Sequence, residues 1–394
     1  MTQDPIVIVS VARTPMGAFQ GELKDIPAAQ LGAAAIRAAL ERAGLQPDDI
    51  QEVLMGCVLM AGQGQAPARQ AALGAGLPQS AGCTTLNKMC GSGMKAAMLA
   101  HDTLVAGSQD IMVAGGMESM TLTPYLLPKA RAGLRMGHSE VLDHMFFDGL
   151  EDAYDKGRLM GTFAEDCAQK YQFSREAQDA FAITSLERAQ KANAEGWFAW
   201  ETVPIALKAG KDERFMERDE PPFKARIDKI PQLRPAFRKD GTVTAANSSS
   251  ISDGAAALVL TRRSVAEKRG LKPLATIIAH TSHAQAPAWF TTAPVGAMQK
   301  LFERTGWGVK DVDLFEVNEA FAVVSMAAMR ELSIPHEKLN VHGGACALGH
   351  PIGASGARIV VSLVGALRKY GLKRGVASLC IGGGEATALA LELA

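Results

Sequence analysis

The sequence lacks several features that would assign it to a functional class directly. Its 394 residues contain 41 Lys and Arg against 41 Asp and Glu, so there is no excess charge of either sign. Binding of nucleic acid through bulk charge is therefore not expected. No apolar run approaches the roughly 18 residues that a membrane-spanning helix needs, so we expect no membrane partner. No Gly-x-Gly-x-x-Gly follows a strand early in the chain, which argues against a dinucleotide-binding enzyme.

The six cysteines form no Cys-x-x-Cys pair, and we expect free thiols in a reducing compartment. Met1-Thr-Gln-Asp-Pro5 leads into an apolar run without the basic segment or cleavage site of a signal peptide, and the C-terminal Leu-Glu-Leu-Ala is not a peroxisomal address. These features predict a cytoplasmic protein. Cys346 and His350 have a spacing that metal sites use, but two further ligands are not found nearby, so we expect no metal site.

Short apolar runs alternate with helical patterns at both ends of the chain, which predicts a layered α/β fold. The expected strands of the first part are residues 6–10, 53–56 and 111–114, and the expected helices are 28–43, 67–74 and 92–105. The alternation resumes at 253–260 and continues to the end.

Residues 119–249 interrupt this alternation. They contain two helical runs, 163–170 and 175–195, and a polar stretch, 208–241, which we interpret mainly as a solvated surface loop. The stretch is too long for an ordinary connection, and this indicates an insertion beside a functional site. The expected division is therefore a first core domain of residues 1–118 with 250–272, a loop domain of 119–249, and a second core domain of 273–394.

Each half of the chain places a reactive side chain where a helix begins. Cys90 stands before Gly-Ser-Gly in the first half. In the second half His350 stands before Pro351, which we expect at the first helical position. In both halves a strand ending in glycines follows, at 111–114 and at 376–380. This weak internal repeat predicts a duplicated α/β unit.

Four of these side chains suggest chemistry. A helix N-terminus brings partial positive charge and free N–H groups to Cys90, and its glycines favour a nucleophile over a packed cysteine. His350 is placed to act as a reactive imidazole. Cys380, at a glycine-rich strand end, is either a core residue or an acid/base group that meets Cys90. Asn318 is either an N-cap or the holder of a water beside His350. The set indicates acyl transfer through a thioester.

The chain resembles the thiolase family, and within it the acetoacetyl-CoA thiolases, over essentially its full length. The resemblance rests on six segments in order: Asn87-Lys-Met-Cys-Gly-Ser-Gly, Gly115-Gly-Met-Glu-Ser119, Leu233-Arg-Pro-Ala-Phe237, Asn318-Glu-Ala-Phe321, Gly349-His-Pro-Ile-Gly-Ala-Ser-Gly356 and Cys380-Ile-Gly-Gly-Gly384. It implies two duplicated βαβαβαββ core domains with a loop-domain insertion.

The resemblance also implies a mechanism, the reversible condensation of two acetyl-CoA molecules. Cys90 matches the nucleophile that is acylated, and His350 the base that takes its proton. Cys380 matches the group that moves the α-proton of the second substrate. One oxyanion hole combines His350 with a water held by Asn318, and the other consists of the N–H groups of Cys90 and Gly382. Donors aimed at a developing enolate are what this chemistry requires.

The family further implies coenzyme A thioesters as substrates, no bound cofactor, and a homotetramer, although dimers also occur. By resemblance Ser249 contacts coenzyme A, and Met160, Phe237 and Phe321 line the acyl and pantetheine tunnel. The segment ending at Phe290 resembles mitochondrial members that accept 2-methyl-branched substrates.

The chain departs from the family at several positions. His342 stands where Asn is usual, and Cys346 where an aliphatic residue is usual. His342 either packs or adds a titrating group near the site. Leu159 replaces a frequent His, which puts one pocket contact in doubt. Pro222 aligns with the loop tyrosine of potassium-activated members, so we expect little potassium dependence.

Two related functions remain as alternatives. A ketoacyl-synthase-like condensing enzyme more typically pairs its cysteine with two histidines, and the Asn318 segment and Cys380 argue against it. A non-catalytic acyl or lipid carrier of the same fold would be expected to have lost the reactive residues that this chain retains.

Overall fold

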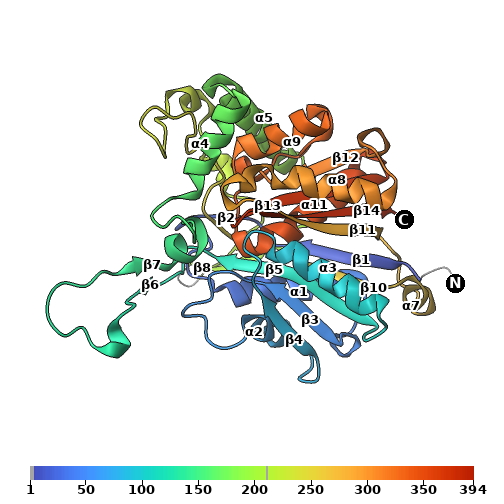
Figure 1. Ribbon diagram of the computed structural model, residues 1–394. Helices are drawn as coiled ribbons and strands as arrows, with labels where there is room; N and C mark the ends of the chain where they lie inside the picture. Colours follow the sequence, from blue (N-terminus) through green and yellow to red (C-terminus); the bar gives the residue numbers. More distant parts are fainter. Residues whose placement is uncertain (1–3, 210–211) are drawn as a thin grey trace.

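The computed structural model describes residues 4–209 and 212–394 (Figure 1). Residues 1–3 of the N-terminal lead-in and residues 210–211 of the polar stretch lie outside the described residues. Within the described residues ten strands form one sheet, in the order β12-β13-β14-β11-β1-β10-β5-β3-β4, with the short β2 paired to β10. No helix in this described part is both long and apolar enough to cross a membrane.

The elements of the first half follow the expected alternation. They are β1 Ile6–Arg13, β2 Gly17–Ala18, α1 Ala28–Ala43, β3 Glu52–Gly56, α2 Pro67–Gly74, β4 Gly82–Leu86, α3 Ser92–Val105, β5 Ile111–Ser119 and, after the insertion, β10 Ser252–Arg262. Helix α1 ends at Gly44, whose left-handed conformation (φ 68°) lets its N–H reach the carbonyls of the last turn.

The second half repeats the strand arrangement of the first. It follows the connecting helix α7 Arg263–Lys268. Its elements are β11 Ala275–Ala284, α8 Ala293–Thr305, β12 Leu314–Val317, α9 Ala322–Leu332, α10 Ala345–Leu348, α11 Ile352–Tyr370, β13 Arg374–Ile381 and β14 Glu385–Leu393. In each half a parallel pair (β3–β5 or β12–β13) is extended by two antiparallel strands (β10 and β1, or β14 and β11). The duplicated α/β arrangement expected from the sequence is therefore present in the sheet.

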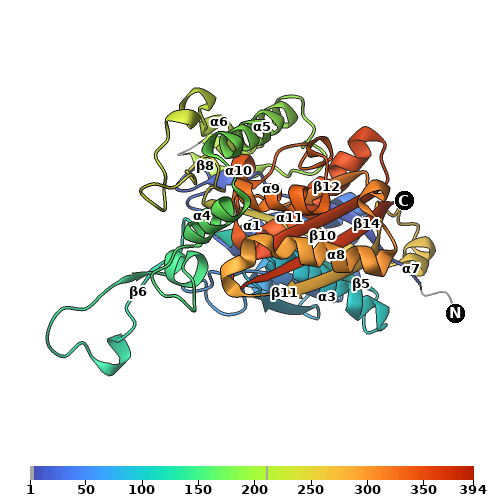
Figure 2. The ribbon, with the colours of Figure 1, turned by 45° about the horizontal axis from the view of Figure 1, so that its top comes forward.

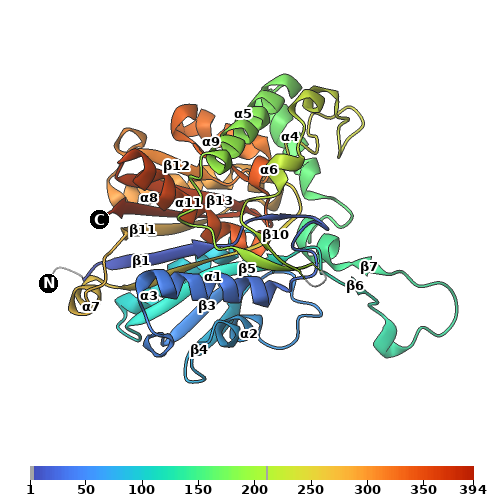
Figure 3. The ribbon, with the colours of Figure 1, turned by 180° about the vertical axis from the view of Figure 1, so that it is seen from behind.

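Helices cover both faces of the sheet, so its central strands are buried on both sides and read as continuous apolar runs. In β1, Val7 and Val9 pack with α1, whereas Ile6 and Ile8 point to the opposite face, toward α3 and α11. Helix α1 lies across the first half of the sheet (Figure 3). Helix α8 packs on β11 and β14 on the outer face of the second half (Figure 2). Helices α3 and α11 therefore form a central layer between the two halves.

Two glycines let α3 and α11 approach each other closely. A Cβ at Gly93 would lie 2.7 Å from the backbone nitrogen of Ala357, and one at Gly356 would lie 2.3 Å from that of Met94. Neither distance leaves room for a side chain. The contact brings the beginnings of the two helices together, and with them Cys90 and His350.

The insertion contains β6 Tyr125–Leu126, β7 Leu142–Asp143, α4 Met160–Tyr171, α5 Arg175–Ala194, β8 Ile205–Ala209, β9 Asp212–Met216 and α6 Pro221–Lys224. The segment between β6 and β7 projects far from the body of the molecule (Figure 1).

The interpretation of 208–241 as a mainly solvated loop is wrong in part. Asp219 and the two following prolines, Pro221 and Pro222, are buried. Asp219 accepts a hydrogen bond from Arg13 of β1 at 2.7 Å, and Arg13 also bonds Glu201 at 2.5 Å; all three side chains are almost fully buried. Buried charges must be paired, so this ion-pair network fixes the insertion to the core.

Candidate active site

One cavity of about 370 Å³ collects nine of the ten residues expected to act in catalysis or substrate binding. It is lined by Cys90, Met160, Phe237, Ser249, Phe290, Phe321, His350, Cys380 and Gly382, among others. The tenth residue, Asn318, is buried beside His350: its Nδ2 lies 3.5 Å from each ring nitrogen of that histidine. The sequence therefore identified a set of residues that the fold brings to one place.

Cys90 occupies a tight turn between β4 and α3. Met89, directly before it, has a positive φ of 47°, which is uncommon for a residue with a side chain. Ser92 closes the turn, since its hydroxyl accepts from the N–H of Lys88 at 2.8 Å and donates to the carbonyl of Met89 at 2.6 Å. Local strain held by such bonds is typical of functional positions.

The Cys90 thiol lies deep below the protein surface, and its exposed part faces the cavity. Burial raises its pKa to about 11, although hydrogen bonds from the backbone N–H groups of Gly382 and of Cys90 itself act in the opposite direction. Cys90 consequently rests as a thiol and needs a base before it can attack. The same two N–H groups lie beside the Cys90 sulfur, as an oxyanion hole for a group attached to it requires.

His350 is held by Ser355 of α11. Its Nδ1 lies 2.6 Å from the Ser355 hydroxyl, which itself donates to the carbonyl of Pro351 at 2.9 Å. With the hydroxyl proton used in that way, Nδ1 must be the donor to Ser355, and Nε2 keeps its lone pair. Burial, aided by the positive charge of Arg358, lowers the pKa of His350 to about 3. The imidazole is therefore neutral near pH 7 and available as a base.

Pro351 stands one residue earlier than expected. It is the N-cap of α11, with extended backbone (ψ 103°), and the helix begins at Ile352. His350 is thus separated from the first helical residue by the proline, and its own N–H donates to the carbonyl of Ser250 at 3.1 Å.

Cys380 lies in β13, one residue before its end, and is almost fully buried. Burial, followed by the closeness of the second ionisable thiol, Cys90, raises its pKa well above the ordinary value for a thiol. The two thiols line the same cavity, so the geometric condition for Cys380 to act as a second acid/base group is met.

A buried network behind the cavity was not predicted from the sequence. Arg358 lies 3.5 Å from the Asn318 side-chain oxygen and 3.5 Å from Glu316. Burial raises the pKa of Glu316 to about 8, with the charge of Arg358 opposing the rise. The signal available in the sequence was a charged residue at each of two apolar runs. Glu316 lies within 314–317, and Arg358 directly precedes 359–367.

Glu118 was quoted only as part of a motif, yet it connects two walls of the site. Its carboxylate accepts from the N–H groups of Val58 at 3.0 Å, Leu59 at 3.1 Å and Gly353 at 2.9 Å. It therefore ties the segment after β3 to the first turn of α11. Burial raises its pKa to about 7, while these N–H groups oppose the shift.

Aromatic rings form the apolar part of the cavity. Phe237 and Phe321 meet edge to face with centroids 5.9 Å apart, and Phe290 packs on Phe163 at 6.1 Å. Leu159 also lines the cavity and adds apolar surface. Such a channel suits a long, largely apolar substrate arm.

His342 and Cys346, which stand shortly before His350 in the chain, both pack against other parts of the protein. His342 packs among the rings of Trp197, Phe198 and Tyr370, with centroids 5.0 to 5.7 Å away. Burial, followed by the charges of nearby cations, lowers its pKa to about 4. The Cys346 thiol lies 3.6 Å from the carbonyl of Glu319. Neither side chain lines the cavity.

The fold is duplicated, and its two halves bring two thiols and an imidazole to one cavity, as the resemblance to thiolases implied. Two family models match the chain, the thiolase N-terminal domain over residues 6–264 and the thiolase C-terminal domain over 271–393. The chain belongs to the thiolase family of acyltransferases.

Individual relatives are similar over nearly their whole length. Acetyl-CoA acetyltransferase 2 of Arabidopsis thaliana is 51% identical, covering 98% of this chain and 97% of the relative. Acetyl-CoA acetyltransferase of Schizosaccharomyces pombe is 46% identical and covers 100% of both. The crystal structure of Acat5 thiolase from Ascaris suum in complex with coenzyme A matches with a TM-score of 0.93 and 39% identity, covering 99% of this chain and 100% of that one.

Proposed function

We propose that the protein is an acetyl-CoA C-acetyltransferase, which joins two acetyl-CoA molecules into acetoacetyl-CoA and free coenzyme A, and which also catalyses the reverse thiolysis. The observation that carries the proposal is the convergence of Cys90, His350 and Cys380 on one apolar cavity. The names of the relatives described above support the choice of substrate.

In the first half-reaction, Nε2 of His350 takes the proton of Cys90, and the resulting thiolate attacks the carbonyl carbon of acetyl-CoA. The negative oxygen receives hydrogen bonds from the N–H groups of Cys90 and Gly382. The C–S bond to coenzyme A breaks, and its thiolate takes the proton of Cys380. The high pKa of Cys380 means that this residue enters the reaction as a thiol, and that its thiolate is a strong base for the next step. Acetyl-Cys90, protonated His350 and the Cys380 thiolate remain.

In the second half-reaction the Cys380 thiolate removes an α-proton from the next acetyl-CoA. The enolate oxygen is stabilised by protonated His350 and a water held by Asn318. The enolate carbon attacks the acetyl group, a C–C bond forms, and Cys90 leaves as a thiolate that recovers its proton from His350. All three side chains return to their starting protonation states, and the products are acetoacetyl-CoA and one coenzyme A.

Coenzyme A binds, in this proposal, along the channel of Met160, Phe237 and Phe321, with Ser249 as a polar contact. No cofactor is required, since proton transfer and thioester exchange are supplied by side chains and substrate.

The test is peptide-level mass spectrometry after brief incubation with acetyl-CoA alone. We expect the acetyl group on Cys90 in the wild type and in Cys380→Ala, and on no peptide in Cys90→Ala. Condensation should fail in both variants. Absence of acetylated Cys90, or equal acetylation of several cysteines, would refute the covalent mechanism and favour a carrier function.

The proposal includes a short acyl chain that can carry a 2-methyl branch, because the segment ending at Phe290, which lines the cavity, resembles that of members that accept such substrates. We expect kcat/KM to be higher for acetoacetyl-CoA and its 2-methyl derivative than for a long 3-ketoacyl-CoA. A strong preference for the long substrate would contradict this assignment.

The proposal includes little potassium activation, because the Pro222 side chain offers no oxygen ligand and its backbone carbonyl accepts from Gln190 at 2.8 Å. Rates in KCl and NaCl should agree. A several-fold higher rate in KCl would count against it.

We also propose a homotetramer, built through the loop domain of 119–249 between the core domains of 1–118 with 250–272 and 273–394. The projecting segment and the residues that lead into it carry exposed apolar side chains of the kind that interfaces cover: Leu122, Tyr125, Leu127, Leu134, Met136 and Val141. Light scattering after size exclusion should give four chains, and a monomer would be incompatible with this. The free thiols support a cytoplasmic enzyme, with a role in fatty-acid metabolism.

A further inference from the structure

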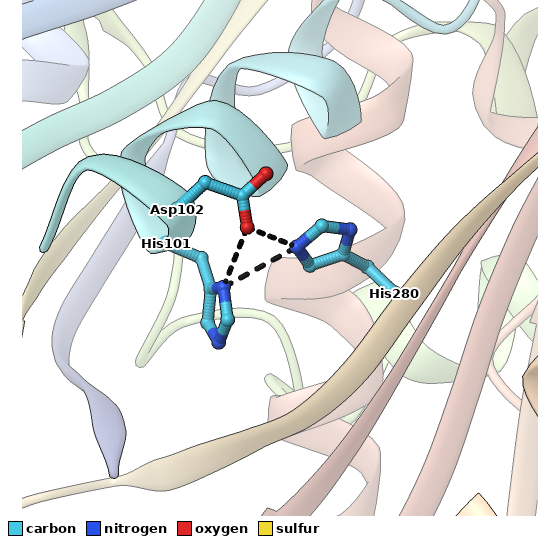
Figure 4. Close-up of side chains that lie close together, drawn as sticks. All are labelled: His101, Asp102 and His280. Carbon is cyan, nitrogen blue, oxygen red and sulfur yellow. Dashed lines mark hydrogen bonds and ion pairs between the residues drawn. The ribbon is translucent and has the colours of Figure 1, made fainter. Parts of the chain in front are cut away.

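A second group of reactive side chains lies apart from the cavity, at the far end of α3. His101 and Asp102 are adjacent on that helix, and His280 reaches them from β11 (Figure 4). His280 Nε2 lies 2.9 Å from Asp102 Oδ1 and 3.3 Å from His101 Nδ1, and His101 Nδ1 lies 3.1 Å from the same Asp102 oxygen. Three potential ligand atoms thus form a small, nearly equilateral triangle.

The size of this triangle matches a face of a metal coordination tetrahedron. With bonds of about 2.0–2.1 Å to nitrogen and oxygen, tetrahedral geometry separates neighbouring ligand atoms by roughly 3.3 Å. The three observed separations lie within a few tenths of an ångström of that value. Two imidazoles and a carboxylate are also a donor set that suits divalent first-row transition metals.

Hydrogen bonding alone does not account for all three contacts. Each ring nitrogen carries either one proton or a lone pair, and the Asp102 carboxylate only accepts. If both rings donate to Asp102, two N–H groups face each other. If one ring donates to the other, the accepting nitrogen turns a lone pair toward the carboxylate oxygen. At most two of the three contacts are favourable at once, whereas a cation satisfies all three.

Nearby charges and burial act on the side chains of the group. Burial lowers the pKa of His280, with Asp102 opposing and His101 and Lys95 adding to the shift. Burial raises the pKa of Asp102, but the hydrogen bond from His101 and the contacts with His280 outweigh it and lower the pKa overall. Lys95 is a nearby positive charge that opposes a cation, and the Asp102 carboxylate offsets it.

We propose that His101 Nδ1, Asp102 Oδ1 and His280 Nε2 bind a divalent transition-metal ion such as Zn²⁺ or Co²⁺, with water in the remaining position. The Asp102 side chain is 55% exposed, which gives the ion a route from solvent. The site joins α3, the helix that begins just after Cys90, to β11, the strand that leads to Phe290. Its role is to hold these two elements together, and it is independent of the reaction proposed above.

The test is titration of the purified protein with Co²⁺, followed by visible absorption. We expect equimolar binding with a ligand-field band typical of tetrahedral nitrogen and oxygen ligands, and without the near-ultraviolet band of cobalt–thiolate bonds. Asp102→Asn and His280→Asn should weaken binding by about tenfold or more. His138→Asn, at an exposed histidine elsewhere, is the matched control and should bind as the wild type.

Thermal unfolding provides an independent readout. Zn²⁺ should raise the Tm of the wild type and of His138→Asn but not that of Asp102→Asn, which changes a surface side chain and should retain condensation activity. No binding, equal affinity in Asp102→Asn, or a cobalt–thiolate band alone would overturn the proposal. Anomalous diffraction from a Zn²⁺-soaked crystal must place the ion within bonding distance of all three atoms, and peaks only at cysteines would exclude the site.

Discussion

Ser355→Ala is the substitution that most directly tests how His350 becomes a base. In the resting site the Ser355 hydroxyl accepts from a neutral imidazole at 2.6 Å. When Cys90 is deprotonated, the same bond is made by an imidazolium. A hydrogen bond between neutral groups contributes about 0.5–1.5 kcal/mol, and one to a charged group about 1.5–3 kcal/mol. The difference of about 1–1.5 kcal/mol corresponds to an acylation rate lowered roughly five- to twelvefold.

The assay is single-turnover acetylation of Cys90 by acetyl-CoA, followed by intact-protein mass. Ser362→Ala is the control, because this buried serine of the same helix bonds Glu201 at 3.2 Å, away from His350. It should alter stability without changing the acetylation rate. If Ser355→Ala acetylates as fast as the wild type, or if the control slows equally, the tautomer argued for His350 is wrong.

Three further predictions concern packing, buried charge and pH. Gly356→Ala should destabilise the protein by about 1–3 kcal/mol, since a Cβ meets backbone at 2.3 Å, measured by denaturant unfolding. Asp219→Ala should cost about 3–5 kcal/mol in the same assay, because it leaves Arg13 buried with one partner fewer. The rate of Cys90 acetylation should not fall as pH decreases through about 6.5, because His350, with a pKa of about 3, stays neutral throughout.

Each of these predictions has a control or a contradicting result. Gly308→Ala, where the nearest atom lies 3.7 Å from the new Cβ, should leave stability nearly unchanged. Asp228→Ala breaks an exposed pair with Arg226 and should also change little. Comparable losses in these controls would contradict the packing and charge arguments. A fall in acetylation centred near the ordinary imidazole pKa would contradict the environment described for His350.

Local signals were enough for much of the fold. Helices α1 and α2 have the bounds expected from the sequence, because Gly44 follows the last residue of α1 and Pro67 is the first residue of α2. Strand β4 was missed, since its alternating exposure and its Thr-Thr pair do not resemble the buried strands beside it. Asp219 was expected in solvent because its partner, Arg13, lies about two hundred positions away, and no local pattern contains that pairing.

The same distinction applies to the site. Cys90, His350 and Cys380 stand in glycine-rich segments that mark close approach, so their placement at the cavity was predictable. The contact between Ser355 and His350 joins residues five positions apart and is local. The contacts of Arg358 with Glu316 and Asn318 depend instead on how α11 packs against β12, and hence on packing between distant segments. The His101, Asp102 and His280 group was invisible for the same reason, since two adjacent residues of a helix meet a strand far along the chain.

The duplicated architecture has a consequence for how activity depends on chain continuity. In the proposed mechanism the nucleophile Cys90 belongs to the first half, whereas His350 and Cys380 belong to the second. The connection between α7 and β11 runs through the exposed Arg269 and Gly270. If the backbone were cut there, one fragment would carry Cys90, and the other would carry His350 and Cys380, so neither fragment would hold all the groups that exchange protons. The rate of turnover would then depend on association of the two fragments. At high dilution it would be proportional to the product of their concentrations.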